Sequence, residues 1–341
     1  MLSGHHNTNY VLRAGLFLAL LLGIAPFVRF KYRVPLKTME VAPRIWTCEV
    51  DVLAVVCRYL PEVPRGFDVP GDRSLHRYLR GIPLSQLNPH GRIGDKLLRE
   101  FAAFFARTAQ VPAEELPARP DDWPADGDSD SFLHWLVDFT EHRVHLPNRD
   151  RFGDLFDAVG IPLDAMMALR RSHRRLARRP FVLLHTDVHR ANVVLRRKGI
   201  SVIDWELAIY GDPLHDLATH LVRMDYSEDE QQRMIALWAE AMEKAGLGLL
   251  TAGLDEDLGT YLDFEYAQSV FPDVMRAALD LPADAREQHL RAAGERVSRA
   301  MRRARRPLGL HDVPDSEQIV EALRKWHSID WQDRLAQAPR Y

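Results

Sequence analysis

Residues 183–221 read LLHTDVHRANVVLRRKGISVIDWELAIYGDPLHDLATHL and place acidic and amide side chains directly beside short apolar runs. The runs NVVL and ISVID have the composition of β-strands, and RRKG between them, ending at Gly199, suits a hairpin turn. Closing this hairpin returns Asp204 to the neighbourhood of Asn192 and Asp187. The stretch therefore predicts two carboxylates and one amide oxygen at one end of a small sheet.

These three side chains have the chemistry of a phosphoryl-transfer site. Carboxylate and amide oxygens are the ligands that Mg²⁺ prefers when phosphate oxygens and water fill its remaining positions. If Asn192 and Asp204 hold the metal, Asp187 is left to orient and deprotonate an attacking hydroxyl. A positioned nucleophile, a bridging metal and cations on the phosphates are what this reaction requires.

The histidines of the same stretch allow a second interpretation. On an extended strand His185, Asp187 and His189 would share one face, and this set could bind non-haem iron or form part of a zinc site. The chain would then be a metal-dependent oxygenase or hydrolase. This interpretation leaves Asn192 and the IDWE run without a role.

The composition is that of a globular protein with about two domains. The chain has 341 residues, of which 46% are hydrophobic and 27% charged, and its net charge is −3. The charge argues against a general nucleic-acid binder, which carries a basic excess. The only cysteines, Cys48 and Cys57, form no CxxC pair, which argues against a disulfide framework or a thiolate zinc site.

One apolar segment near the N-terminus, residues 15–28, raises the question of a signal peptide or membrane anchor. It is shorter than the roughly 18–20 residues that a membrane span needs, and no A-x-A-like cleavage site follows it. We expect a buried hairpin with a turn at residues 23–26, no membrane association and a cytoplasmic location.

The order of patterns along the chain predicts a small β-rich part followed by a larger helical part. Residues 1–79 have strand patterns with one helix near residues 47–60. A linker and the amphipathic helix DKLLREFAAFFARTA follow, and the remainder is mostly helical. A cleft between two such lobes is a natural ligand site.

The segments HTDVHRAN and VIDWELAIYGDPLHDLA resemble the aminoglycoside phosphotransferase and choline kinase superfamily, whose members are relatives of protein kinases. The positions that match the family pattern are His185, Asp187, Asn192, Asp204, Trp205, Glu206, Gly211, Asp212, Pro213, Asp216, Leu217 and Ala218. The resemblance implies an α+β, bilobal, protein-kinase-like fold. It implies a nucleotide-binding N-lobe over residues 1–79, a hinge near 76–83, and a mainly helical catalytic and substrate-binding C-lobe over 80–341.

The resemblance also implies roles for the residues of the motif. Asp187 is expected to be the catalytic base, and Asn192 and Asp204 are expected to ligate Mg²⁺. His185 and Asp216 are expected to brace the catalytic loop. Two further residues are expected on the substrate side, His189, which could instead brace the loop, and Glu206.

Two segments of the N-lobe resemble nucleotide-binding elements of the family. SGHHNTNYVL is similar to a loop whose backbone N–H groups and small polar side chains close over phosphates, which implies contacts from Ser3 and Asn7. SLHRYLRGIPLSQL resembles the hinge, where adenine is expected to bond to the backbone around Tyr78. The resemblance implies ATP or GTP, together with Mg²⁺.

The strand FVRFKYR supplies candidate cations for the nucleotide phosphates. Alternation places Arg29, Lys31 and Arg33 on one face. A lysine there resembles the strand-borne cation that grips the α- and β-phosphates and is held by a helix glutamate. We expect Lys31 in this role with Glu49 as its partner; Arg29 and Glu40 are the alternative pair, and a solvated basic strand is the interpretation without function.

The segment DEDLGTYLDFEYAQSVFPD interleaves carboxylates with aromatic residues and is a candidate acceptor-binding helix. We expect Asp263, Glu265 and Tyr266 to contact the acceptor. Carboxylates beside aromatic rings suit a polyamine-like or quaternary-ammonium compound through charge pairing and cation–π contact. An ordinary solvated helix face is the alternative.

Three classes of function follow. The first is a kinase that transfers the γ-phosphate of a nucleoside triphosphate to a hydroxyl of a small, cationic, aminoglycoside-like antibiotic, for resistance or self-protection. A metabolic kinase of choline-, thiamine- or sugar-like alcohols is the alternative within this class. The second is the metal-dependent oxygenase or hydrolase, and the third is a catalytically silent binding module on the kinase fold. We expect a monomer or dimer without a nucleic-acid partner.

Overall fold

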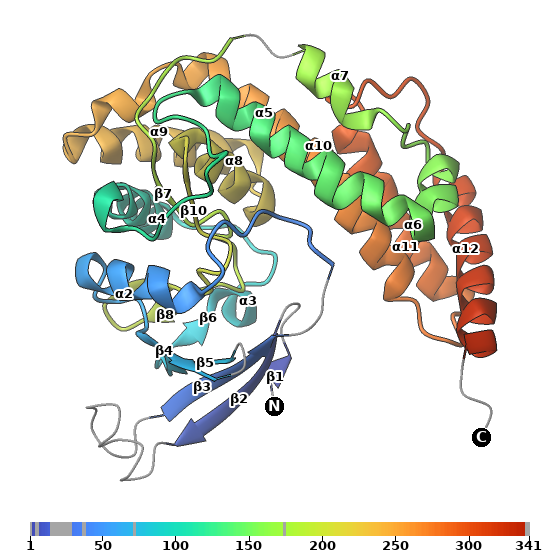
Figure 1. Ribbon diagram of the computed structural model, residues 1–341, viewed down its shortest axis with the longest axis horizontal. Coiled ribbons are helices and arrows are strands. Elements are labelled where there is room, and N and C mark those ends of the chain that lie inside the picture. Colours follow the sequence, from blue (N-terminus) through green and yellow to red (C-terminus); the bar gives the residue numbers. More distant parts are fainter. Residues whose placement is uncertain are drawn as a thin grey trace. The chain divides into compact units, whose positions relative to one another are not determined.

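The computed structural model describes residues 2–3, 7–13, 29–35, 39–70, 73–172 and 175–337 (Figure 1). Its contacts divide the chain into two compact units. Unit 1 comprises Met1–Met39, Pro43–Phe132 and Ala177–Leu254, and unit 2 comprises Glu40–Ala42, Leu133–Leu176 and Asp255–Tyr341. The lobe boundary expected between residues 79 and 80 falls within unit 1, and the assignment of these ranges to nucleotide and substrate binding stays a prediction.

An antiparallel sheet of five strands forms the N-terminal part of unit 1, in the order β1-β2-β3-β5-β4. Its strands are β1 (Leu2–Ser3), β2 (Asn7–Arg13), β3 (Arg29–Pro35), β4 (Gly66–Val69) and β5 (Arg73–Arg77). Helix α2 (Glu49–Tyr59) packs against β4 and buries Val52, Leu53 and Val56 (Figure 1). The hairpin expected over residues 15–28 lies outside the described residues.

Two small sheets carry the motif-bearing segment of unit 1. Strand β8 (Val193–Arg196) pairs with β9 (Gly199–Val202) and with β6 (Ile82–Pro83), while β7 (Val182–Leu184) pairs with β10 (Ile209–Gly211). Gly199 has a φ of 96°, a conformation that costs glycine little. The hairpin that the sequence predicts is therefore confirmed.

Helices surround these strands in unit 1. They are α3 (Leu84–Leu87), α4 (Asp95–Thr108), η1 (Ala113–Glu115), α8 (Pro213–Met224), α9 (Glu228–Lys244) and η3 (Gly248–Thr251). The amphipathic helix α4 buries its apolar face against α9 and β7, as its residue spacing predicts. Helix α8 packs against β7 and α9, and the side chain of Asp212 caps it by accepting a hydrogen bond from Leu214 N at 2.9 Å.

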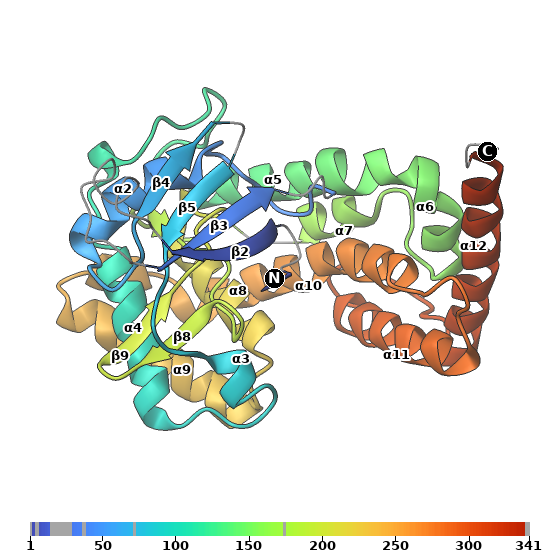
Figure 2. The same ribbon diagram turned by 90° about the horizontal axis from the view of Figure 1, so that it is seen from below.

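Unit 2 is helical throughout its described elements. These are α5 (Ser129–Phe139) from Leu133 onward, the π-helix η2 (Thr140–His145), α6 (Leu146–Ala158), α7 (Ala165–Ser172), α10 (Leu254–Leu279) from Asp255 onward, α11 (Glu287–Ala304) and α12 (Ser316–Gln337). Helix α12 packs against α6 and α11 (Figure 2). Trp326 stacks on Phe152 with ring centroids 5.2 Å apart. None of the helices in the described ranges combines the length and apolarity that crossing a membrane requires.

Candidate active site

The loop that follows β7 is held by a carboxylate of α8. The backbone N–H groups of His185 and Thr186 donate to the two carboxylate oxygens of Asp216, at 3.0 and 2.8 Å. Thr186 has a φ of 57°, a left-handed conformation that is costly for a threonine, and its hydroxyl donates to Leu207 O at 2.6 Å. The surroundings therefore fix the turn through which the chain leaves β7.

His185 lies inside the protein rather than in a metal site. Its ring packs against Trp205 at 4.6 Å between centroids, and its Nδ1 accepts a hydrogen bond from Asp187 N at 3.2 Å. Burial lowers the pKa of His185 to about 4, so the ring is neutral.

The His-Asp-His interpretation requires an extended strand through residues 185–189, but β7 ends at Leu184 and the chain turns at Thr186. That premise is wrong, and His185, Asp187 and His189 do not share a strand face. Among the described residues, no group of three or more His, Cys, Asp or Glu side chains is arranged to hold a metal ion.

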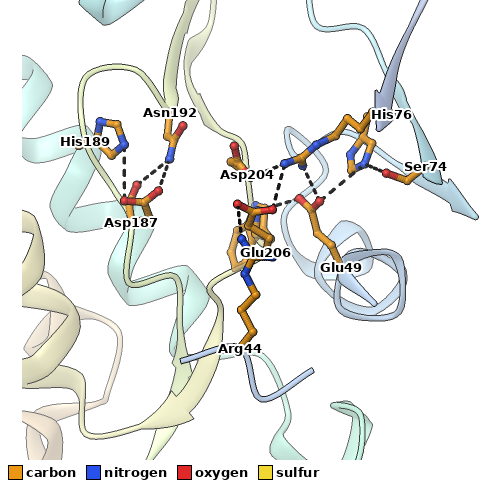
Figure 3. Close-up of polar contacts among 11 residues, drawn as sticks. Arg44, Glu49, Ser74, His76, Asp187, His189, Asn192, Asp204 and Glu206 are labelled. Atoms are coloured by element: carbon orange, nitrogen blue, oxygen red, sulfur yellow. Dashed lines mark hydrogen bonds and ion pairs between the residues drawn. The ribbon is translucent and has the colours of Figure 1, made fainter. Parts of the chain in front are cut away.

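The carboxylate of Asp187 is held from two sides (Figure 3). Asn192 Nδ2 donates to Asp187 Oδ2 at 2.7 Å and to Asp187 O at 3.1 Å. Arg223 Nη1 contacts Asp187 Oδ1, and His189 Nε2 lies 3.5 Å from the same oxygen. Burial alone would raise the pKa of Asp187, but Arg223 and His189 outweigh it and hold this pKa below its usual range.

Asp204 lies beside this pair because the hairpin closes there. Ile203 N donates to Asn192 O at 2.9 Å, one step beyond the paired Val193 and Val202. Asp204 itself has a φ of 71°. The hairpin thus brings the candidate metal ligands together, as the spacing predicts, while their roles stay predictions.

The oxygen atoms of Asn192 and Asp204 have the chemistry of magnesium ligands. Asn192 uses its amide nitrogen on Asp187, so its amide oxygen is the atom left to ligate a metal. Burial would raise the pKa of Asp204, but Arg33 and Lys31 lower it, so the carboxylate is ionised. An amide oxygen and a charged carboxylate are hard ligands of the kind that Mg²⁺ prefers.

Arg33 of strand β3 forms ion pairs with Glu49 and with Asp204, two residues labelled in Figure 3. Its Nη1 lies 2.5 Å from Glu49 Oε2, and its Nη2 lies 2.7 Å from Asp204 Oδ1 and 3.4 Å from Glu206 Oε2. Glu49 Oε1 also accepts a hydrogen bond from Trp205 N at 2.8 Å. Only 4% of the Arg33 side chain is exposed, so these charges meet away from water.

The structure does not show the expected ion pair between Lys31 and Glu49. Within the described ranges no ion pair joins them, and the partner of Glu49 is Arg33, two residues further along β3 on the same face. The planar guanidinium offers several N–H groups in a fixed fork, so it can bind Glu49 and Asp204 together, whereas an ammonium acts as a point charge. Burial, followed by the charge of Arg33, lowers the pKa of Lys31.

The alternative pair, Arg29 with Glu40, stays a prediction, because Arg29 belongs to unit 1. Glu40 belongs to unit 2, where its Oε2 lies 3.1 Å from Arg143 Nη2. Arg29 is exposed at the beginning of β3.

Three polar residues that the sequence analysis missed surround the Arg33 cluster (Figure 3). His76 Nε2 lies 3.7 Å from Glu49 Oε2, and Ser74 Oγ lies 2.8 Å from the same nitrogen. Burial, followed by the charge of Arg33, lowers the pKa of His76 to about 3, so this ring is neutral. Arg44 Nη2 lies 3.2 Å from Glu206 Oε1. The sequence alone could not place His76 beside β3, because its position depends on the pairing register of β5, in which His76 lies opposite Lys31.

The nucleotide-loop residues belong to β1 and β2, but the side chains of Ser3 and Asn7 lie outside the described part of the structure. In the hinge, the N–H of Tyr78 donates to Arg29 O at 2.9 Å, so the sheet already uses this donor. A Cβ at Gly81 would lie 2.4 Å from Leu195 O, which explains the glycine where the hinge passes β8.

The residues expected to bind the acceptor lie on α10 in unit 2. Asp263 Oδ1 lies 2.5 Å from Arg306 Nη2. Glu265 is 2% exposed and accepts a hydrogen bond from Gln268 Nε2 at 3.1 Å, while Tyr266 is half-buried. Both carboxylates are therefore engaged within unit 2, and their role in acceptor binding stays a prediction.

Comparisons with known proteins identify the chain's relatives. A sequence profile described as the phosphotransferase enzyme family matches residues 4–253. No curated protein matches the sequence.

Similar solved structures include a putative aminoglycoside phosphotransferase from Ralstonia eutropha, with 15% identity, a TM-score of 0.54, and coverage of 95% of this chain and 94% of that one. A choline kinase from Cryptosporidium parvum has 12% identity, a TM-score of 0.50, and coverage of 96% and 92%. An ethanolamine kinase from Plasmodium vivax has 11% identity, a TM-score of 0.50, and coverage of 86% and 79%. At such identities the likeness shows the fold, and it confirms the kinase-like architecture with its small sheet-rich N-terminal part.

Proposed function

The chain belongs to the phosphotransferase enzyme family, and from this premise we propose that it transfers the γ-phosphate of ATP, or of GTP, to a hydroxyl of a small molecule. The convergence of Asp187, Asn192 and Asp204 at the end of the β8–β9 hairpin is the observation that carries this proposal. Use of a nucleoside triphosphate suits a cytoplasmic enzyme, and we propose that it acts as a monomer or a dimer.

Asp187 acts on the acceptor in this mechanism. Its ionised carboxylate accepts a hydrogen bond from the acceptor hydroxyl, aims that oxygen at the γ-phosphorus and takes up the proton as the new O–P bond forms. The bond from the γ-phosphorus to the β–γ bridging oxygen breaks, and the nucleoside diphosphate leaves with that oxygen. Asn192 fixes one carboxylate oxygen, so the side chain is oriented before the acceptor binds. Asn192 and Asp204 would hold Mg²⁺, which when bound neutralises charge on the β- and γ-phosphates.

Arg33 and Lys31 of β3 have different roles in this proposal. Arg33 forms ion pairs with Glu49, Asp204 and Glu206, and so it orients these carboxylates. Lys31 lies on the same strand face and, among the described side chains, makes no ion pair within 4 Å. It is the cation that the site offers to the α- and β-phosphates.

The acceptor is a cationic, aminoglycoside-like antibiotic or a metabolic alcohol such as choline, thiamine or a sugar. The first rests on the carboxylates and aromatic residues of α10. The second is favoured by the engagement of Asp263 with Arg306 and of Glu265 with Gln268, since these carboxylates already have partners. If the antibiotic is the acceptor, Asp263→Asn or Glu265→Gln should raise its KM and leave nucleotide binding unchanged.

A coupled assay of ADP or GDP release tests the proposal. Wild type and Asp187→Asn are each mixed with Mg²⁺ and ATP or GTP, and hygromycin B, other aminoglycosides, choline, thiamine and sugars are added one at a time. At least one acceptor should increase turnover by wild type, and mass spectrometry should find it phosphorylated. No turnover with any acceptor, or purified protein carrying stoichiometric iron or zinc, contradicts the proposal.

A further inference from the structure

Helix α8 contacts the catalytic loop through three side chains on one of its faces. Asp216, His220 and Arg223 are spaced i, i+4 and i+7, which places them one above another along a helix. Asp216 accepts from the N–H groups of His185 and Thr186, as described above. The family motif includes Asp216 but ends before the other two residues.

The second contact of this stripe, His220, is made to the loop backbone. Its Nδ1 lies 2.8 Å from Val188 O, and its Nε2 lies 3.0 Å from Tyr226 Oη. Because the ring is neutral, Nδ1–H donates to the carbonyl and Nε2 accepts from the tyrosine. The rings of Phe101 and Phe105 pack on His220 at 4.9 and 5.2 Å, so the donor cannot swing away from the loop.

The third contact is made to the catalytic side chain itself. Arg223, in the last turn of α8, places Nη1 on Asp187 Oδ1, while Asn192 binds Oδ2. The Arg223 side chain is 31% exposed, whereas Asp187 is 15% exposed. One helix therefore holds the backbone before Asp187, the backbone after it and one oxygen of its carboxylate.

We propose that Arg223 is a positioning residue that acts through Asp187 and holds the carboxylate in the plane that meets the acceptor hydroxyl. A carboxylate on a short side chain turns about two bonds, and one hydrogen bond from Asn192 leaves rotation about that bond open. A second bond to the other oxygen fixes the plane. The inference rests on the proposed role of Asp187, and a displacement of a reacting group by about 1 Å costs about 10²-fold in rate.

The test is a double-mutant cycle with turnover as its readout. Arg223→Met, Arg223→Lys, Asp187→Asn and the double variant Asp187→Asn with Arg223→Met are compared with wild type. The substrate is MgATP with the best acceptor from the panel above, or MgATP alone with water as acceptor. Arg92→Met is the matched control, since it breaks an exposed ion pair with Asp229 elsewhere in unit 1.

We expect Arg223→Met to lower kcat about 10–10²-fold while the KM for ATP changes less than about twofold. Arg223→Lys should restore part of kcat, and Arg92→Met should leave it unchanged. In the Asp187→Asn background, Arg223→Met should cost little more, because a residue that acts through another is non-additive with it.

Two results separate failure of this inference from failure of the proposed function. If Asp187→Asn loses activity while Arg223→Met keeps wild-type kcat, or if the two effects add fully, Arg223 is not a positioning residue and the proposed function stands. If wild type shows no turnover, or Asp187→Asn turns over like wild type, the proposed function fails and this inference fails with it.

Discussion

Arg33 and Asp204 are separated by 171 positions in the sequence, yet Arg33 Nη2 lies 2.7 Å from Asp204 Oδ1. The same guanidinium binds Glu49 of α2, so one buried side chain joins the sheet, the helix and the candidate metal ligand. Removing one partner of a buried ion pair leaves charge unpaired away from water. We therefore expect Arg33 to contribute both to the stability of the fold and to nucleotide binding.

Arg33→Met should lower the free energy of unfolding by up to about 3 kcal/mol, because it leaves Glu49 and Asp204, whose side chains are only 10% and 25% exposed, without their cation. It should also weaken MgATP binding, since Asp204 loses the contact that orients it. Urea unfolding and nucleotide titration measure the two effects. Arg44→Met is the control: the Arg44 side chain is 40% exposed, so this change should alter stability by less than about 1 kcal/mol.

Unlike Arg33→Met, Lys31→Ala should lower ATP turnover far more than it lowers the free energy of unfolding. The reason is that Lys31 forms none of the ion pairs of the described residues. Exposed Arg29, two residues earlier on β3, provides the matched Arg29→Ala control for turnover with MgATP. If Arg29→Ala is the more damaging change, the phosphates meet β3 at a different position.

Asp204→Ala should remove most of the dependence of nucleotide affinity on Mg²⁺, because the carboxylate is one of the two proposed oxygen ligands at the hairpin end. Calorimetric titration with ATP, with and without Mg²⁺, measures this dependence in wild type and variant. Equal magnesium dependence in both proteins would exclude Asp204 as a ligand.

Local spacing made the hairpin and the loop predictable. Asp187, Asn192 and Asp204 lie within 18 positions of one another, and one turn at Gly199 is enough to bring them together. The helix α4 was equally predictable, because its apolar residues recur at helical spacing.

The choice between Lys31 and Arg33 depended on contacts that no local pattern encodes. Alternation placed both on one strand face, but the partner of Glu49 is set by how α2 packs against the sheet. Arg223 was missed for a different reason. Its i+7 spacing from Asp216 was visible in the sequence, yet only the path of the loop shows that the stripe meets Asp187.

Acid should destabilise the protein through its buried neutral histidines. Burial lowers the pKa of His220 to about 4, whereas an imidazole in an unfolded chain titrates near 6.5. Between these values the unfolded chain binds more protons, so this contribution is complete above pH of about 6.5 and is lost as pH falls towards about 4. His220→Gln should therefore flatten the fall in unfolding free energy over this window, by up to about 3 kcal/mol.

Urea unfolding at four pH values between 7.5 and 4.5 measures this slope for wild type and for His220→Gln. His90→Gln is the control, because His90 is exposed and should leave the slope as in wild type. A slope that His220→Gln leaves unchanged would assign the acid sensitivity to other groups, of which His215, with a pKa lowered by burial to about 3, is the next candidate.

Asp187→Asn is the decisive substitution for the reaction. Asparagine keeps the shape of the side chain and one accepting oxygen, but it replaces the other oxygen by an NH₂ group and removes the negative charge proposed to accept the hydroxyl proton. Loss of a general base commonly costs about 10²–10⁴ in rate, so kcat should fall by a factor in this range while MgATP still binds.

His189→Ala should cost much less, because His189 Nε2 only approaches Asp187 Oδ1 at 3.5 Å and Arg223 contacts that oxygen more closely. Steady-state kinetics of both variants, with nucleotide affinity measured separately, check the assignment. Equal losses in the two variants would instead give the imidazole a direct part in the chemistry.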